Sequence, residues 1–469
     1  MRGIPPRFYG FICIGPLLPN VLFPIEANPS SMVSSQPGGT GLSRSLGLAE
    51  ITLSGIGIIL GAGIYALIGT AAAGAGNAVW LAFAISAVIA LFTALSYAEL
   101  SSMFPKAGAE YDYTSAALGE YVAFIVGWMI IFAGILGAAT VALGFGGYFH
   151  ELFGIGQIPA AVALIGILTV VLFIGVKESA GVAGLFTLIE GVGLVLIIIA
   201  GLPRLGSVDY LEMPFGISGV FTAAALVFFA YQGFEEMVKF SEETRDPQKT
   251  VPKALMIALV VCTALYILVC ISAVSVVGWE GLAGSDAPFA EVATVAWGPR
   301  AADLLSAIAL FATANTVLLM LLASSRIAYR MARSGSLPGL LSRVHPTRKT
   351  PYLAILAAAL GAVLFLFAGD IGFIANATNF TIFVTFMIVN LSVIILRIRS
   401  PDAVRPFRVP GSIGRIPVLP LLGIVTSLFL FLQLTPEILA IGALIVIIGG
   451  IAALFAGRRQ DDLEVNEEH

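Results

Sequence analysis

Long apolar stretches alternate with short polar connections along most of this chain. Twelve stretches are apolar enough to form helices that cross a membrane, since a span needs roughly 18 consecutive apolar residues. They are expected near residues 47–73, 78–103, 121–149, 158–176, 180–202, 217–241, 253–277, 301–330, 352–368, 371–396, 416–432 and 437–456. The pattern therefore predicts an all-α polytopic membrane protein.

The first apolar stretch contains Gly61, Ala62 and Gly63 in its middle. Each glycine lowers helix propensity by roughly 1 kcal/mol, so we expect the helix to be broken there. In hydrocarbon, a broken turn needs partners for its N–H and C=O groups, or a wet cavity. Its N–H groups would suit a carboxylate. The alternative is a continuous helix that packs through small residues.

A second interruption lies at residues 228–235, inside the stretch from 217 to 241, and reads Phe-Phe-Ala-Tyr-Gln-Gly-Phe-Glu. Interrupted apolar segments in corresponding positions of two halves are typical of transporters built from inverted repeats. We therefore expect the binding site where these two breaks meet.

The composition agrees with a membrane protein, since 58% of residues are hydrophobic, 11% are charged and the mean hydropathy is +0.99. Three cysteines indicate no disulfide framework. The three histidines, His150, His345 and His469, are too scattered to form a metal cluster. We expect no metal and no cofactor.

The distribution of Lys and Arg predicts the topology. With both ends of the chain in the cytoplasm, 22 of the 24 basic residues fall in inside segments, and Arg204 and Arg300 fall outside. Residues 1–45 are predicted to be a disordered cytoplasmic tail, with Met32 as an alternative start, and residues 457–469 a second cytoplasmic tail. In the charged segment before the seventh span, Pro252 is placed for a helix start.

An ordered set of motifs carries a resemblance to a known family. The motifs are Gly-Ala-Gly-Ile-Tyr at 61–65, Phe-Pro-Lys-Ala-Gly-Ala-Glu-Tyr-Asp-Tyr at 104–113, Gly-Trp at 127–128, the break at 228–235, Glu-Glu-Thr-Arg-Asp-Pro at 242–247, and Ser-Arg at 325–326. Each motif is weak alone, but the ordered set is specific. Over roughly residues 46–396 the chain resembles the amino acid–polyamine–organocation superfamily of permeases.

The resemblance implies a five-plus-five inverted repeat in which the first and sixth helices are broken. The first repeat would cover residues 46–202, the second would cover 216–396, and two peripheral helices would lie at 397–456. It also implies alternating access around an amino acid that is held at the two breaks.

The resemblance assigns backbone groups to this amino acid. The N–H groups that would bind its carboxylate follow Gly61 and belong to Ala62, Gly63 and Ile64. The groups that would bind its ammonium belong to Phe229, Ala230 and Gly233, and the Phe229 ring would cap the substrate from outside.

Two carboxyls are candidates for proton coupling or gating. Glu190 lies in the middle of a predicted span, where a charge costs several kcal/mol unless it is paired or neutral. In some proton-coupled relatives a lysine occupies this region, so the carboxyl here puts that lysine mechanism in doubt. The alternative is a permanently protonated acid that bonds a neighbouring helix. Glu235 could gate, carry a proton or pair with a base, or be an acid that the start of the second half-helix favours.

Polar residues of the eighth and tenth spans are further candidates. In sodium-coupled relatives, hydroxyls of the eighth span bind Na⁺, and this chain has Thr313, Asn315 and Thr316 there. Oxygen ligands suit the ion, but such hydroxyls also bond to their own helix without any function. Asn376, Asn379 and Asn390 indicate a polar lining in the tenth span, although no role is assigned to any one of them.

The predicted function is secondary active transport of amino acids across the plasma membrane, with H⁺ as the coupling ion. The partners are an amino acid and the lipid bilayer, with no nucleic acid. Relatives that carry cationic amino acids can hold an acid in the third span, but residues 130–137 carry no charge. A neutral substrate is therefore favoured, and the carboxyl of Glu235 leaves a cationic substrate as the alternative.

Other functions were weighed against transport. A Na⁺-coupled symporter and an amino acid exchanger are alternatives within the class, and a non-transporting amino acid receptor belongs to another class. A channel is disfavoured because nothing in the sequence resembles a charged or carbonyl ring. An enzyme is set aside because no His or Asp lies in the core of the predicted spans for a nucleophile–base pair or a metal.

Overall fold

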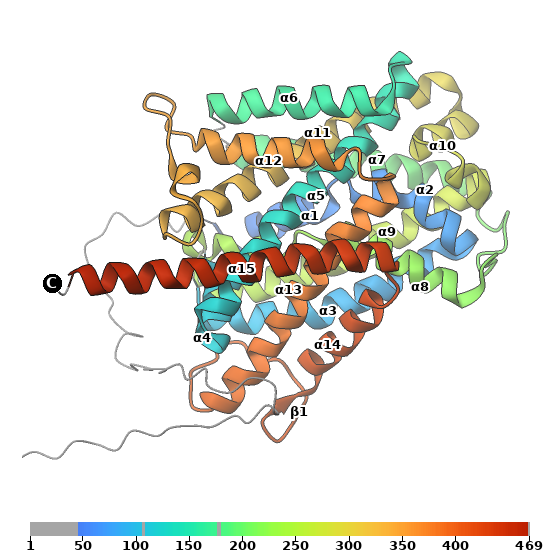
Figure 1. Ribbon diagram of the computed structural model, residues 1–469. Helices are drawn as coiled ribbons and strands as arrows, with labels where there is room; N and C mark the ends of the chain where they lie inside the picture. Colours follow the sequence, from blue (N-terminus) through green and yellow to red (C-terminus); the bar gives the residue numbers. More distant parts are fainter. Residues whose placement is uncertain (1–45, 106–107, 176–179, 468–469) are drawn as a thin grey trace, which may run out of the picture. The chain divides into compact units, whose positions relative to one another are not determined.

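Helices make up most of the described chain, which comprises residues 46–105, 108–175 and 180–467 of a computed structural model (Figure 1). The α-helices are α1 (Leu48–Leu60), α2 (Gly63–Ala75), α3 (Val79–Met103), α4 (Ala109–Leu118), α5 (Glu120–Phe153), α6 (Gln157–Ile174), α7 (Ala180–Gly201), α8 (Gly216–Val227), α9 (Pro247–Ala283), α10 (Pro288–Trp297), α11 (Pro299–Arg333), α12 (Tyr352–Phe365), α13 (Ile371–Arg399), α14 (Val418–Phe431) and α15 (Pro436–Glu467). The 3-10 segments are η2 (Gly76–Ala78), η3 (Leu202–Arg204), η4 (Phe228–Tyr231), η5 (Phe234–Glu243) and η6 (Gly339–Ser342). A small antiparallel hairpin joins β1 (Ser412–Ile413) to β2 (Ile416–Pro417).

Every predicted apolar range contains helix, and the prediction of an all-α polytopic membrane protein is confirmed. Among the described residues, nine helical stretches are long and apolar enough to cross a membrane, with Gly63–Met103 counted as one stretch. Three further apolar helices, α1, α12 and α14, are shorter. Helix α15 continues to Glu467, beyond the predicted end of the last span. The predicted tail at residues 1–45 lies outside the described residues.

Two short helices, α4 and α10, were not predicted, because their apolar runs are too short to stand out beside the long spans. Each precedes a long helix, α5 or α11, and a single glycine joins each pair. Gly119 has φ 89° and Gly298 has φ 91°, a backbone conformation that glycine adopts with little steric cost. The arrangement of short helix, glycine and long helix therefore occurs once in each half of the chain.

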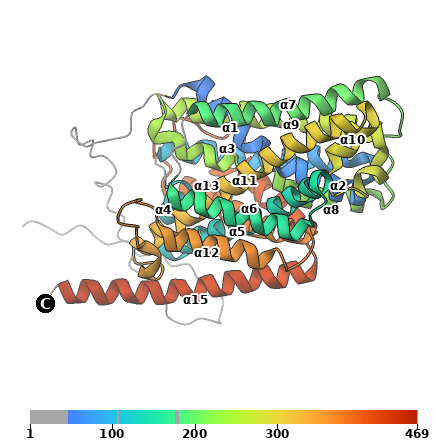
Figure 2. The same cartoon turned by 90° about the horizontal axis from the view of Figure 1, so that it is seen from above.

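The long helices pack closely through small residues. Helix α5 contacts α11, α6, α12 and α13, and α3 contacts α9. A Cβ built on Gly134 of α5 would lie 1.9 Å from the Ser324 hydroxyl oxygen and 3.1 Å from the Met320 carbonyl oxygen of α11, so the two helices approach closely at this glycine. Near the end of the chain, α15 packs against α5 (Figures 1 and 2), and Trp128 Nε1 donates to the Ile445 carbonyl (2.9 Å).

The charged segment after the second break ends where α9 begins, at Pro247. The prediction that Pro252 starts this helix is wrong, because Pro252 lies inside it. Pro247 occupies the first helical turn, where the N–H that proline lacks would have no partner within the helix. Asp246 precedes it with φ 47°, and its carbonyl accepts the N–H groups of Lys249 and Thr250.

Candidate functional site

The first break lies where the glycines predicted it. Helix α1 ends at Leu60, the chain turns at Gly61 (φ 28°, ψ −161°), and α2 begins at Gly63. The Ala62 N–H donates to the Thr316 hydroxyl oxygen of α11 (3.1 Å). A side chain from another helix thus satisfies one of the N–H groups that the break releases.

The second break is also confirmed and is longer. Helix α8 ends at Val227, and η4 covers Phe228–Tyr231. Gln232 is extended, Gly233 has φ 114°, and η5 then begins at Phe234. This backbone is interrupted over several residues inside one apolar stretch.

The two breaks lie directly against each other. A Cβ on Gly63 would lie 2.7 Å from the Cα of Ala230, and a Cβ on Gly233 would lie 2.9 Å from the Ile58 carbonyl oxygen. Only glycine permits backbones to approach this closely. The structure therefore brings together the segments that the sequence analysis assigned to one site.

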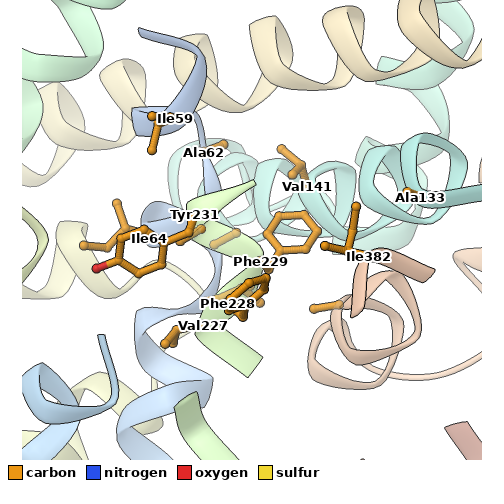
Figure 3. Packing of buried hydrophobic residues seen from close by; sticks show 14 of the residues in the cluster. Ile59, Ala62, Ile64, Ala133, Val141, Val227, Phe228, Phe229, Tyr231 and Ile382 are labelled. Atoms are coloured by element: carbon orange, nitrogen blue, oxygen red, sulfur yellow. The ribbon is translucent and has the colours of Figure 1, made fainter. Parts of the chain in front are cut away.

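Apolar side chains enclose this meeting point. Ile64 and Ala62 are 0% exposed, Ala230 is 2% exposed and Phe229 is 3% exposed. They belong to one buried cluster that also contains Val141 of α5 and Ile382 of α13 (Figure 3). The candidate site is closed to solvent on the side of these residues.

Tyr266 of α9 connects the two breaks, and the sequence analysis missed it. Its hydroxyl lies 2.6 Å from the Ile59 carbonyl oxygen, 3.2 Å from that of Leu60 and 3.0 Å from that of Ala230. The side chain is fully buried. A buried tyrosine needs a partner for its hydroxyl, and a tyrosine within an apolar span was the one available signal. Tyr266 thus holds carbonyls from both breaks together.

The three candidate sodium ligands of α11 do not share one environment. Thr316 accepts the Ala62 N–H and donates to the Ala312 carbonyl (3.0 Å). The Thr313 hydroxyl donates to the Ala309 carbonyl of its own helix (2.7 Å). Asn315 instead extends toward Glu190. Thr316 therefore lies at the first break, whereas the Thr313 hydroxyl bonds within its own helix.

Glu190 of α7 is buried, and its carboxyl has one side-chain hydrogen-bond partner among the residues that the structure describes. It is 1% exposed, and Asn315 Nδ2 donates to its Oε1 at 3.3 Å. Its backbone carbonyl accepts the Tyr65 hydroxyl of α2 (2.7 Å). Within the described ranges no cation forms an ion pair with this carboxyl. Glu190 thus contacts α2, which follows the first break, and α11, whose Thr316 hydroxyl bonds to that break.

Glu235 lies in the second break and accepts the Gly233 N–H at 2.8 Å. The carboxyl caps the start of η5, which matches the alternative of a favoured acid at a half-helix start. Its neighbour Glu236 forms an ion pair with Lys239. The geometry therefore gives Glu235 a local structural contact.

The asparagines of α13 bond between helices. Asn379 donates to the carbonyls of Ala225 (2.7 Å) and Leu226 (2.9 Å) at the end of α8, and it accepts from Gln232 Nε2 (2.8 Å). Asn390 donates to Thr93 of α3 (2.9 Å). Asn379 and Asn390 are fully buried, whereas Asn376 is partly exposed and its Oδ1 has no hydrogen-bond partner among the described residues. Asn379 supports the second break.

Known proteins match this chain over most of its length. The family model of amino acid permeases covers residues 46–455. The chain is 35% identical over 431 residues to the branched-chain amino acid permease BcaP of Bacillus subtilis (strain 168), which covers 86% of this chain and 90% of that relative. It is 31% identical over 462 residues to the methylthioribose transporter of the same organism, over 93% of this chain and 98% of that relative.

A plant protein is also similar. The chain is 32% identical over 389 residues to the vacuolar cationic amino acid transporter 4 of Arabidopsis thaliana, over 77% of this chain and 65% of that relative. The family match extends from the residues before α1 into α15, so it includes both breaks and the helices that support them. The chain belongs to the amino acid permease family of the amino acid–polyamine–organocation superfamily.

Proposed function

We propose that the protein is a secondary active transporter that moves neutral amino acids across the plasma membrane by alternating access, coupled to protons. The observation that carries this proposal is the contact between two helix breaks at an enclosed position. A solute that is bound there can leave only when helices move. That requirement is the basis of alternating access.

The breaks offer complementary ends to a zwitterion. The first turn of α2, from Gly63, presents N–H groups and a positive helix end, which suit a carboxylate. The carbonyls of Ile59, Leu60 and Ala230, which Tyr266 gathers, present negative partial charge to an ammonium group. In an amino acid, the ammonium nitrogen and the carboxylate carbon are both bonded to the same carbon. We therefore assign the main-chain part of an amino acid to this place.

Several observations support a neutral side chain. The surrounding residues, among them Ile64, Phe229 and Val141, are apolar. Glu235 is engaged by the Gly233 N–H. A relative named for branched-chain amino acids also supports this substrate class. The relatives named for cationic amino acids and for methylthioribose supply the competing substrates that a test must include.

The proposed architecture has twelve crossings in a five-plus-five inverted repeat, with both termini in the cytoplasm. Two correspondences support the repeats at 46–202 and 216–396. The break after α1 corresponds to the break after α8, and the pair α4 and α5 corresponds to the pair α10 and α11. The helices of residues 397–456 would be peripheral, and no cofactor is required.

Glu190 is the proposed proton carrier. It lies within a span, and its one side-chain partner is an amide rather than a cation. It is also linked to the first break, because Tyr65 of α2 bonds its backbone. Movement of α2 would therefore change the surroundings of the carboxyl. Sodium coupling is the second candidate, and the position of the Thr316 hydroxyl at the first break supports it.

Uptake into proteoliposomes tests the proposal. Labelled leucine, alanine, lysine and methylthioribose are offered under an inward proton gradient, an inward sodium gradient and no gradient. Wild type is compared with Glu190→Gln, and with Glu291→Gln as a matched control that changes an exposed carboxyl on α10. We expect proton-driven uptake of leucine or alanine by wild type and the control. Glu190→Gln should bind substrate but not accumulate it.

Other results would select the alternatives. Sodium-driven uptake that Glu190→Gln retains would reject Glu190 as the coupling group and favour Thr316. Rapid exchange from preloaded vesicles without accumulation would indicate an exchanger. Binding without uptake or exchange would indicate a receptor, and preferred uptake of lysine or methylthioribose would reject the neutral amino acid.

A further inference from the structure

The turn before α12 is fixed to the end of α6. The Thr350 hydroxyl donates to the Phe173 carbonyl (3.0 Å), one of the last carbonyls of α6 that has no partner within the helix. The His345 N–H donates to the Thr350 carbonyl (2.9 Å), and the His345 ring packs edge-on against Phe173 with centroids 5.2 Å apart. The turn therefore has a defined position relative to α6.

This turn holds basic side chains at its tip. Lys349 has φ 59°, a left-handed conformation that is unfavourable for a residue other than glycine, and its N–H donates to the His345 carbonyl (3.0 Å). Arg343, Arg348 and Lys349 are exposed, and no described carboxylate pairs with any of the three. Two of these cations, Arg348 and Lys349, thus lie in the turn itself, where Lys349 has the strained conformation, and Arg343 lies just before it.

An apolar groove adjoins the turn, between α6 and α12, which lie side by side in Figures 1 and 2. It has a volume of about 210 Å³ and is lined by Thr169, Val170, Phe173, Tyr352, Ile355 and Leu356. Thr169 lies about 7 Å along the helix from the last residue of α6, at 1.5 Å per residue. The groove therefore runs from the end of the helices, where the cations are, into the depth of the span.

We propose that this place binds one anionic phospholipid, with an acyl chain in the groove and the phosphate at Arg348 and Lys349. The apolar lining suits a hydrocarbon chain, and the unpaired cations suit a phosphate at the level where the helices end. A free phosphate would use the cations but not the groove. The inference does not depend on the transported solute, and it goes beyond the proposed function.

Lipid retention by the purified full chain tests this proposal. Protein in detergent is incubated with phosphatidylglycerol, phosphatidylcholine or glycerol phosphate, and bound lipid is counted by native mass spectrometry. Arg348→Gln with Lys349→Gln removes the cations, and Val170→Trp fills the groove while all charges remain. Arg326→Gln with Arg330→Gln is the matched control, because it removes two exposed cations from α11.

We expect one phosphatidylglycerol per chain, and binding about thirty-fold weaker in the Arg348 and Lys349 variant, since each basic group near an anionic surface contributes about a five-fold change. Val170→Trp should also lose the lipid, and the control should keep it. Equal retention of phosphatidylcholine, equal loss in the control, or binding of glycerol phosphate as tight as that of the lipid would overturn the proposal. Unchanged retention in both test variants would overturn it as well.

Discussion

Two carboxyls inside the helix bundle are equally buried and have opposite surroundings. Glu99 of α3 and Glu190 of α7 are each 1% exposed. Arg397 of α13 donates to both oxygens of Glu99, from Nε at 2.9 Å and from Nη2. The Val409 N–H adds a third bond (2.8 Å). Glu190 receives one bond, from the amide of Asn315.

The difference separates a carboxyl whose negative charge is compensated by a cation from one that has no ion-pair partner among the described residues. Arg405 also lies 3.3 Å from Glu99, and its guanidinium donates to carbonyls of the loop after α13, among them Ser400 (2.9 Å). Glu99 thus ties this loop to α3 through two arginines. A charge on Glu190 would lack such compensation, so the comparison indicates a structural role for Glu99 and supports the coupling role that we propose for Glu190.

Removing the partner of Glu99 should have the largest effect on stability. Arg397→Leu leaves a buried carboxylate without its bidentate partner, and we expect the free energy of unfolding to fall by about 3–5 kcal/mol. Thermal unfolding in detergent measures this loss. Arg415→Leu, which changes an exposed arginine near β2, is the control. The double variant Glu99→Met with Arg397→Leu should recover most of the loss, and a double variant as unstable as Arg397→Leu would contradict the assignment.

Tyr266→Phe should have the next largest effect on stability. The change keeps the ring and removes the hydroxyl that holds the carbonyls of both breaks. The hydroxyl supplies one proton to this group of buried carbonyls, and its removal should cost about 1–3 kcal/mol. The KM for the transported amino acid should also rise, because the carbonyls lose their fixed positions. Tyr329→Phe serves as a control in α11, and equal stability of the two variants would show that Tyr266 does not support the breaks.

Glu190→Gln should change the free energy of unfolding by about 1 kcal/mol or less, because the glutamine oxygen can still accept from Asn315. Its effect should instead be on coupling, with loss of proton-driven accumulation and retention of substrate binding. Unfolding and uptake are measured on the same preparation. A loss of stability as large as that of Arg397→Leu would place Glu190 with Glu99, as a structural group.

Local backbone constraints made the two breaks predictable. The glycines at 61, 63 and 233 mark places where helix is unfavourable or where a neighbouring backbone comes too close for a side chain. Long apolar runs likewise placed the helices. Helices α4 and α10 could not be predicted from the sequence, because a short helix gives too little periodic signal.

Partners that lie far apart in sequence could not be predicted. Tyr266 and the Ile59 carbonyl are 207 positions apart, and Arg397 and Glu99 are 298 positions apart. Arg397 was counted only among the basic residues at a membrane boundary, although it is 3% exposed. The composition of a span does not tell which way its single polar side chain points. For the same reason, the sequence could not predict that Thr313 and Thr316 lie in different environments.

Glu110 of α4 is a third buried carboxyl, and its charge is compensated more than that of Glu190 but less than that of Glu99. It is 2% exposed and accepts the Tyr97 hydroxyl at 3.2 Å. Charged residues of η5 also act on Glu110. The cation of Lys239 favours its ionised form, and the carboxylates of Glu235 and Glu236 disfavour it. Tyr113 of its own helix is also close. Glu110 thus has a neutral hydrogen-bond donor and a distant cation, but no bidentate arginine.

Burial raises the pKa of Glu110, with Lys239 acting in the opposite direction and Glu236 adding to the rise. The folded protein therefore holds this proton at pH values where the unfolded chain has lost it, and the free energy of unfolding falls as pH rises through the folded pKa. Glu110→Gln removes the ionisation, so its melting temperature should fall less than that of wild type as pH rises above 4.5, the ordinary pKa of a glutamate. The difference should be the smallest of the series. Parallel curves for the two proteins would mean that Glu110 is compensated as fully as Glu99, and that burial without a bidentate cation does not distinguish these carboxyls.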